Sequence, residues 1–133
     1  MKNKKTISIL IALLLLAITF SANAQNWDGQ WVRKGGCDLK ITNVTASEFT
    51  FSFNCFNGKN FGELEGKVII NGNKARYSGE ADGLCPINFT LTEKGLKVEE
   101  DRTKDCENGA GNGVYFSGDY AKKGSPVKKT KKK

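Results

Sequence analysis

The stretch CDLKITNVTASEFTFSFNC, residues 37–55, begins and ends with a cysteine and holds two runs in which apolar and polar residues alternate. Alternation with a period of two is typical of half-buried β-strands, and the turn-forming segment NVTAS separates the two runs. A hairpin folded at this turn places Leu39 opposite Phe53, with the apolar side chains on one face. In the same register Cys37 lies opposite Cys55, within reach of a disulfide bond. The register that buries the aromatic rings therefore also pairs the two sulfur atoms.

The alternative, two buried free thiols, requires a reducing compartment, and the N-terminus argues against one. A basic start, MKNKK, is followed by the apolar run ISILIALLLLAITF and by small residues that end in Ala22-Asn23-Ala24. These are the parts of a secretory signal peptide, for which we expect cleavage near Ala24. An uncleaved membrane anchor is the alternative, although the apolar run is short for a stable span. The sequence therefore predicts a signal peptide over residues 1–24 and a secreted or periplasmic protein.

Residues 25–133 suffice for one domain with one hydrophobic core. They contain all four cysteines, and an even number in an oxidising compartment predicts two disulfide bonds. If Cys37 pairs with Cys55, the second bond joins Cys85 to Cys106. A zinc site is the rival interpretation, but the chain has no histidine and no CxxC pair. We therefore expect two disulfides, no bound metal and no cofactor.

The second disulfide, unlike the first, does not follow from a simple hairpin register. In a tight hairpin over residues 85–102, Cys85 lies opposite Arg102 and not opposite Cys106. The bond forms only if the chain before Asn108 turns back toward Cys85.

Turn signals divide residues 25–120 into about eight short strands, and no stretch beyond the signal peptide shows helical periodicity. Strands at this spacing indicate an antiparallel sheet that closes into a barrel, or a sandwich. A barrel disposes of unpaired edges, so we expect an all-β fold: an eight-stranded antiparallel meander closed into a small, disulfide-linked barrel. Eight strands leave an interior that is filled by side chains or holds a small ligand. The expected strands cover residues 27–33, 37–42, 49–55, 61–70, 74–78, 87–91, 96–98 and 114–120.

The dipeptide Asn71-Gly72 is a hairpin signal between two of these strands. A two-residue loop at this dipeptide places Ile70 opposite Asn73. It also places Gly66 opposite Tyr77, so we expect the tyrosine ring to cover the bare glycine backbone.

Basic residues are unevenly distributed along the chain. Residues 25–120 carry 11 basic and 14 acidic side chains, whereas residues 121–133 hold seven lysines and no acid. The folded domain is thus slightly acidic, and the overall net charge of +7 does not make it a nucleic-acid-binding domain. The tail, residues 121–133, has little apolar content and is predicted to be disordered. It either contacts an anionic surface or only keeps the protein soluble. Its lysines are Lys122, Lys123, Lys128, Lys129, Lys131, Lys132 and Lys133.

The chain offers little for catalysis. It has no histidine, its cysteines are expected in disulfides, and no serine has an evident base beside it. Two acidic groups, Glu63 with Glu65 and the run 99–101, remain as acid/base candidates. The simpler interpretation is that both groups solubilise the sheet. The glycines of residues 109–113 match no nucleotide-binding pattern. We therefore expect a binding protein and not an enzyme.

Gly29-Gln30-Trp31, at the start of the first expected strand, resembles the Gly-x-Trp signature of lipocalins and the wider calycin barrels. In that family the tryptophan plugs one end of the barrel. The resemblance implies that Trp31 is such a plug and that the protein carries a small ligand or a glycan.

A second resemblance, which covers more of the chain, is to the small periplasmic lysozyme-inhibitor barrels of bacteria, which are secreted and cysteine-paired. The stretch 75–79, Ala-Arg-Tyr-Ser-Gly, is similar to the segment ending in Arg-Tyr of the inhibitors of C-type lysozyme. Those inhibitors push a loop into the cleft of the enzyme. The resemblance implies a binding site at Arg76, Tyr77, Ser78, Glu80 and Asp82.

Taken together, the sequence predicts a monomeric, exported binding protein with three candidate functions. The first is inhibition of a lysozyme or another cell-wall hydrolase, which requires a protein partner. The second is the binding of a small ligand or glycan. The third is a structural role in the cell envelope, with the lysine tail docked on an anionic surface. The state of the barrel interior, open or filled, discriminates among them.

Overall fold

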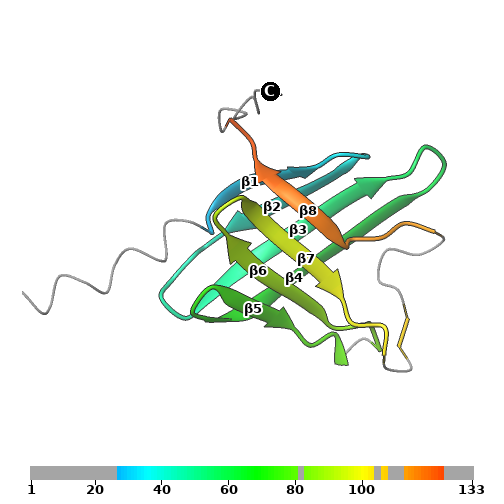
Figure 1. Ribbon diagram of the computed structural model, residues 1–133. Coiled ribbons are helices and arrows are strands. Elements are labelled where there is room, and N and C mark those ends of the chain that lie inside the picture. The colour runs from blue at the N-terminus through cyan, green and yellow to red at the C-terminus, as the bar shows by residue number, and fades with distance from the viewer. Residues whose placement is uncertain (1–26, 81–82, 104–105, 108–112, 125–133) are drawn as a thin grey trace, which may run out of the picture.

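The computed structural model describes residues 27–80, 83–103, 106–107 and 113–124 (Figure 1). In this part of the chain, eight antiparallel strands follow one another around a closed barrel, and the last strand pairs with the first. The predicted all-β meander and its closure are therefore confirmed. No helix in these ranges is long and apolar enough to cross a membrane. The strands are β1 (Gly29–Arg33), β2 (Cys37–Thr42), β3 (Glu48–Phe56), β4 (Phe61–Asn71), β5 (Lys74–Tyr77), β6 (Ile87–Thr92), β7 (Gly95–Glu100) and β8 (Gly118–Lys122).

The hairpin of β2 and β3 has the register that the alternating sequence predicts. Leu39 faces Phe53, and Cys37 faces Cys55. The two cysteines are bonded to each other, and both are buried. The first predicted disulfide is thus confirmed, and it links neighbouring strands on the inner face of the barrel.

Aromatic rings fill the interior of the barrel. Phe49, Phe51 and Phe53 point inward from alternate positions of β3, and none is more than 1% exposed. Phe89 of β6 meets all three, with ring centroids 5.3–6.0 Å apart. Phe116 stacks on Phe53 at 4.6 Å. Burial of each of these rings stabilises the fold by roughly 1.5–3 kcal/mol.

The connections between strands differ at the two ends of the barrel (Figure 1). The hairpin end carries only the short turns 43–47, 72–73 and 93–94. The loop end carries the turns 34–36 and 57–60 and the long connections 78–86 and 101–117.

Two tryptophans close the hairpin end from the inside. The Trp27 indole is 1% exposed and lies 5.1 Å from the Phe49 ring. Trp31 is 3% exposed, and its indole N–H donates a hydrogen bond of 2.9 Å to the Trp27 carbonyl. The ammonium group of Lys122 stands 5.3 Å from the centre of the Trp31 ring, where a cation–π attraction holds it. Trp31 is therefore a core residue close to this end, and Trp27 shares the position.

The turn between β4 and β5 differs from the prediction by one residue. Asn71 pairs with Lys74, so Gly72 and Asn73 form the two-residue turn. Gly72 has a φ of +63°, whereas Asn73 does not have a positive φ. A type II′ turn requires a glycine at this first central position, which explains why the turn is centred after Asn71. The predicted pairing of Ile70 with Asn73 is therefore wrong.

The expected cover of Gly66 by a tyrosine is present despite this shift. A Cβ atom added to Gly66 would lie 2.9 Å from the Tyr77 ring and 2.8 Å from the Phe51 ring. The rings of Tyr77 and Phe51 meet edge to face, with centroids 5.2 Å apart. Tyr77 is half-buried, so it belongs to the packing of the barrel wall.

The last strand begins four residues later than the sequence predicts. Residues 114–117 show the burial alternation of a strand, with Val114 and Phe116 buried and Tyr115 exposed. They form no strand ladder, and β8 starts only at Gly118 and ends at Lys122. The expected strand 114–120 is thus wrong at both ends. The barrel takes in Ala121 and Lys122, which the sequence assigned to the tail.

Candidate binding surface at the loop end

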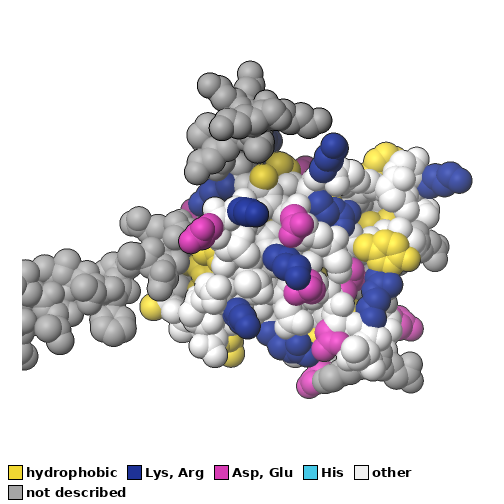
Figure 2. All heavy atoms as spheres, in the orientation of Figure 1, with side chains coloured by type: hydrophobic (Ala, Val, Ile, Leu, Met, Phe, Trp, Pro, Cys, Tyr) yellow, Lys and Arg dark blue, Asp and Glu magenta, His cyan; other side chains and the backbone are white. Residues whose placement is uncertain are grey.

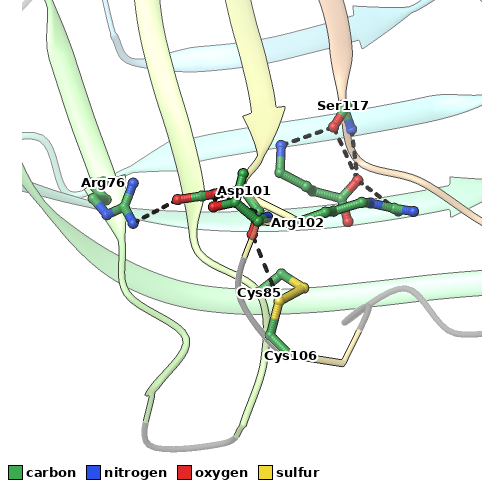
Figure 3. The surroundings of a disulfide bond; sticks show 8 residues. Arg76, Cys85, Asp101, Arg102, Cys106 and Ser117 are labelled. Atoms are coloured by element: carbon green, nitrogen blue, oxygen red, sulfur yellow. Dashed lines mark hydrogen bonds and ion pairs between the residues drawn. A yellow bond between two sulfur atoms is a disulfide. The ribbon is translucent and has the colours of Figure 1, made fainter.

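The second disulfide organises the long connections at the loop end. Cys85 and Cys106 are bonded, as the cysteine count predicts (Figure 3). The backbone N–H of Cys85 donates to the Glu107 carbonyl at 2.9 Å, and the N–H of Glu107 donates to the Gly83 carbonyl at 3.0 Å. The chain after β7 therefore turns back beside the 78–86 connection, which this disulfide requires. Both disulfides lie at the loop end, and bonds of this kind persist in secreted and periplasmic proteins.

The 78–86 connection is tightly folded where it leaves β5. The Leu84 N–H donates to the Gly79 carbonyl at 2.9 Å. Gly79 has a φ of +67°, and a Cβ atom at this position would collide with the Leu84 carbonyl. Only glycine satisfies both constraints. The connection is consequently held by backbone hydrogen bonds, by Gly79 and by a disulfide within a few residues.

The structure divides the predicted binding residues between two faces. Arg76, Ser78 and Glu80 are exposed, whereas Tyr77 packs inward on the barrel wall. Asp82 lies outside the described residues. The alternation of an extended chain explains the division, since successive side chains of a strand point to opposite faces. Of the predicted residues that the structure describes, three remain accessible to a partner.

Arg76 is held in place by Asn88 and Asp101 on the outer face of the sheet, and Figure 3 shows its contact with Asp101. One Nη atom donates to the Asn88 Oδ1 at 2.7 Å, and the other forms an ion pair with the Asp101 carboxylate at 3.2 Å. Hydrogen bonds from Thr103 and then from Arg76 lower the pKa of Asp101 below its ordinary value. The pair is exposed, so it orients the guanidinium group more than it stabilises the fold.

A groove of about 450 Å³ runs over the outer face of β4, β5, β6 and β7 beside Arg76. Figure 2 shows charged side chains of both signs scattered over the face of β5–β8. The groove walls carry an amide, a hydroxyl and basic groups from Asn88, Thr90, Lys74 and Arg76. Such a depression on a sheet can donate hydrogen bonds from Lys74 and Arg76 to a polar ligand, and it is separate from the packed interior.

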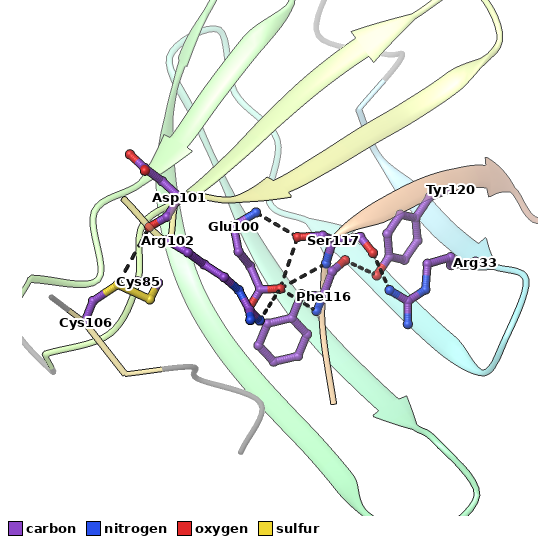
Figure 4. Close-up of polar contacts among 9 residues, drawn as sticks. All are labelled: Arg33, Cys85, Glu100, Asp101, Arg102, Cys106, Phe116, Ser117 and Tyr120. Carbon is purple, nitrogen blue, oxygen red and sulfur yellow. Dashed lines mark hydrogen bonds and ion pairs between the residues drawn. A yellow bond between two sulfur atoms is a disulfide. The ribbon is translucent and has the colours of Figure 1, made fainter. Parts of the chain in front are cut away.

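Glu100 is a buried carboxylate whose role the sequence analysis missed (Figure 4). Its side chain is 2% exposed, and its Oε2 accepts hydrogen bonds from the N–H groups of Phe116 at 3.0 Å and Ser117 at 3.3 Å. The Ser117 hydroxyl lies 3.1 Å from the same oxygen, and Arg102 is 3.6 Å away. The carboxylate therefore accepts the hydrogen bonds that the carbonyl groups of a neighbouring strand would otherwise accept from the segment before β8.

The position of Glu100 could have been found from the alternation of β7. Leu96 and Val98 point into the barrel, and Glu100 is the next residue on the same face. The run Glu99-Glu100-Asp101 instead indicated a solvated acidic cluster. For Glu99 that interpretation holds, because its carboxylate is exposed and pairs with Lys97 at 2.7 Å.

Arg33 and Tyr120 complete the polar contacts at this end (Figure 4). The Arg33 guanidinium donates to the Ser117 carbonyl. The Tyr120 hydroxyl donates to the Phe116 carbonyl at 2.7 Å and lies 2.9 Å from the Cys37 sulfur. Burial raises the pKa of Tyr120 well above its ordinary value, although the nearby Arg33 opposes this change. The segment before β8 is thus fixed to β1, β7 and β8 by side chains.

Exposed aromatic rings also lie at the loop end. Phe56 and Phe61 flank the 57–60 turn, stack with centroids 4.5 Å apart, and are 42% and 70% exposed. Tyr115 is 46% exposed, and the Arg102 guanidinium lies 4.2 Å from the centre of its ring. Figure 2 shows hydrophobic side chains gathered over the tip of the β3–β4 hairpin. Aromatic residues and arginine are the types that protein interfaces favour.

The remaining candidates are placed as follows. Glu63 and Glu65 lie on the outer face of β4, both exposed, as the simpler interpretation expected. No cluster of metal-ligating side chains occurs among the residues that the structure describes. The predicted signal peptide and Lys128, Lys129 and Lys131–Lys133 lie outside them.

Comparison of the chain with models of protein families, with curated proteins and with solved structures finds no match.

Proposed function

We propose that this chain is an exported, non-catalytic binding protein that contacts a protein partner through the loop end of its barrel. A lysozyme or another cell-wall hydrolase is the first partner to test. The observation that carries the proposal is the contrast between a filled interior and a reinforced loop end. With Phe49, Phe51, Phe53 and Phe89 filling the barrel, recognition has to take place on the outside.

The 78–86 connection is the part of the loop end that best suits insertion into an enzyme cleft. Backbone hydrogen bonds and the Cys85–Cys106 bond restrain its described residues, 78–80 and 83–86, before any partner binds. A restrained loop loses little conformational entropy on binding, which favours affinity. Ser78 and Glu80 are exposed on it, and Arg76 stands beside it with an oriented guanidinium group. Export through the predicted signal peptide would bring the protein to the compartment where cell-wall hydrolases act.

The test is an inhibition assay with the exported, oxidised protein and lysozymes of several types at micromolar concentration. We expect inhibition of at least one type, with a loss of inhibition when Ser78→Arg places a large side chain on the 78–86 connection. Glu93→Lys, at an exposed position of the hairpin end, is the matched control and should inhibit like the unmodified chain. Full activity of every lysozyme in the presence of the protein would reject this partner class.

A second candidate function, glycan binding, is supported by the groove beside Arg76. Its walls hold amide, hydroxyl and charged groups, which are the groups that bind sugar hydroxyls. We expect soluble cell-wall oligosaccharides to shift the amide NMR signals of Asn88 and Thr90. A lack of any shift at millimolar oligosaccharide would remove this candidate and leave the first standing, because the first depends on the 78–86 connection and shares only Arg76 with the groove.

A further inference from the structure

β4 is much longer than the strand that follows it around the barrel. β3 pairs with β4 from Phe61 to Ile69, whereas β5 pairs with β4 only from Ile69 to Asn71. In Figure 1 the β3–β4 hairpin accordingly extends beyond β5 and β6. The side of β4 that faces away from β3 therefore has no strand beside it over Phe61–Val68 in the described part of the chain.

The hydrogen-bond pattern identifies which backbone groups are left over. The Asn57 N–H donates to the Asn60 carbonyl, so Asn57 and Asn60 are a hydrogen-bonded pair. Hydrogen-bonded and non-hydrogen-bonded pairs alternate along an antiparallel ladder, so the even-numbered residues of β4 bond to β3. The N–H and C=O groups of Glu63, Glu65 and Lys67 therefore point away from β3. None of the hydrogen bonds that the structure shows among its described residues satisfies them. They form a row of donors and acceptors, which is the template that strand addition uses.

Two of the three side chains beside this row, Glu63 and Glu65, are acidic, and the third, Lys67, forms an ion pair with Glu48 at 3.1 Å. Glu63 has no hydrogen-bond or ion-pair partner among the described residues, and Glu65 contacts only the Ser52 hydroxyl, at 3.2 Å. Both project from the same face, two residues apart. An extended segment that pairs with this edge would place its own alternate side chains opposite the two carboxylates, so lysines two residues apart match them.

The C-terminal tail of this chain has that pattern. Lys129 and Lys131 are two residues apart in the sequence VKKTKKK, which contains no acid. They can face Glu65 and Glu63 in either strand direction. We propose that the open edge of β4 is a docking site for the lysine tail of a second copy of the protein, which adds as an extended strand.

The tail of the same copy reaches the edge with too few residues left to pair along it. β8 and β4 are four strands apart, so the path around the barrel is about 19 Å, and the open edge begins about 13 Å from the hairpin end. The combined distance of about 23 Å uses roughly seven extended residues. Residues 125–133 number nine, so about two would remain for pairing. The occupant has to come from another molecule.

The first experiment measures association of the full exported chain by analytical ultracentrifugation at low ionic strength. We expect the average mass to rise with protein concentration and to return to that of a monomer at high salt, because screening weakens the pairs. Lys129→Glu with Lys131→Glu should abolish the rise, whereas Lys132→Glu with Lys133→Glu makes the same charge change out of register and should weaken it less. A chain that stays monomeric at all concentrations would overturn the proposal.

A charge exchange tests the contact itself. Glu63→Lys with Glu65→Lys should weaken association about five- to tenfold, as expected for two exposed ion pairs. Mixing this variant with the Lys129→Glu, Lys131→Glu variant should restore it. Association that no tail substitution changes would mean that β4 edges pair with each other, which also contradicts the proposal.

A synthetic peptide of residues 126–133 locates the site. Added to labelled protein, it should shift the amide signals of Glu63, Glu65 and Lys67 and protect their amides from hydrogen exchange. Shifts confined to other acidic residues, such as Asp119 and Glu93, would show a diffuse electrostatic contact in place of strand addition.

Discussion

The two ends of the barrel are closed by different means. At the hairpin end, short turns bring the strands together, and the Trp27 and Phe49 rings fill the space inside. At the loop end, the Cys85–Cys106 bond and the Glu100 carboxylate hold the long connections in place, and the Cys37–Cys55 bond joins β2 to β3. Packing of rings ties the conformation of one end to the core. Cross-links and hydrogen bonds fix the other end while its outward side chains stay free for recognition.

The largest predicted effect belongs to the hairpin end. Trp27→Ala should lower the free energy of unfolding by about 3–5 kcal/mol, because it leaves a large cavity against Phe49. Phe61→Ala, the control at the loop end, should change it by less than about 0.5 kcal/mol, because that ring is 70% exposed. Chemical denaturation measures both. An equal loss of unfolding free energy in the two variants would show that ring packing stabilises both ends alike.

The double variant Cys85→Ala, Cys106→Ala tests whether the loop end is held by its disulfide independently of the core. The bond spans 21 residues, and its removal should cost about 3 kcal/mol through the freedom that the unfolded chain regains. Amide hydrogen exchange should accelerate in the 78–86 connection and leave β2 and β3 protected. Uniform acceleration through the barrel would mean that the loop end is not an independent unit.

Glu100→Ala should destabilise the protein by about 1–3 kcal/mol, since the N–H groups of Phe116 and Ser117 lose their acceptor. Glu99→Ala is the control next in sequence, and its exposed pair with Lys97 should contribute less than about 1 kcal/mol. Thermal unfolding of the two variants compares them. A larger effect for Glu99 would contradict the assignment of Glu100 as the acceptor that anchors this segment.

The smallest predicted effect concerns alkaline pH. Burial keeps the Tyr120 phenol neutral in the folded state, so its pKa there lies above the ordinary value of 10.0. Above pH 10 the unfolded chain loses the proton first, and stability should fall by up to about 1.4 kcal/mol for each pH unit. Below pH 10 this contribution is fully present. Tyr120→Phe should be less stable at neutral pH but should show a weaker decline above pH 10.

Local alternation was enough to predict the first hairpin and its disulfide. Every inward residue of β2 and β3 is apolar, so a slip by one residue would expose the whole set of rings, and only one register is acceptable. The barrel closure followed from the number of strands and the cost of free edges. In the β2–β3 hairpin, the alternation of the sequence and the packing of the core therefore require the same register.

Other features depended on contacts that sequence spacing does not contain. Residues 114–117 alternate like a strand, yet the N–H groups of Phe116 and Ser117 donate to the Glu100 side chain, which no pairing rule anticipates. The turn after Asn71 moved by one residue because Gly72 suits the first central position of a type II′ turn as well as the second of a type I′ turn. Strand alternation puts Arg76 and Tyr77 on opposite faces, but which of them faces outward followed only once β5 was placed in the sheet.

The pairing of β8 with β1 has a consequence for the biogenesis of the protein. The ladder that joins Trp31 to Lys122 connects the first and last parts of the barrel, so the sheet stays open until nearly the whole chain is available. A chain threaded through a membrane from its N-terminus would therefore complete its fold only after translocation has almost finished. If the chain is exported in this way, late closure would postpone the completion of the barrel, and with it the burial of both tryptophans, until after translocation.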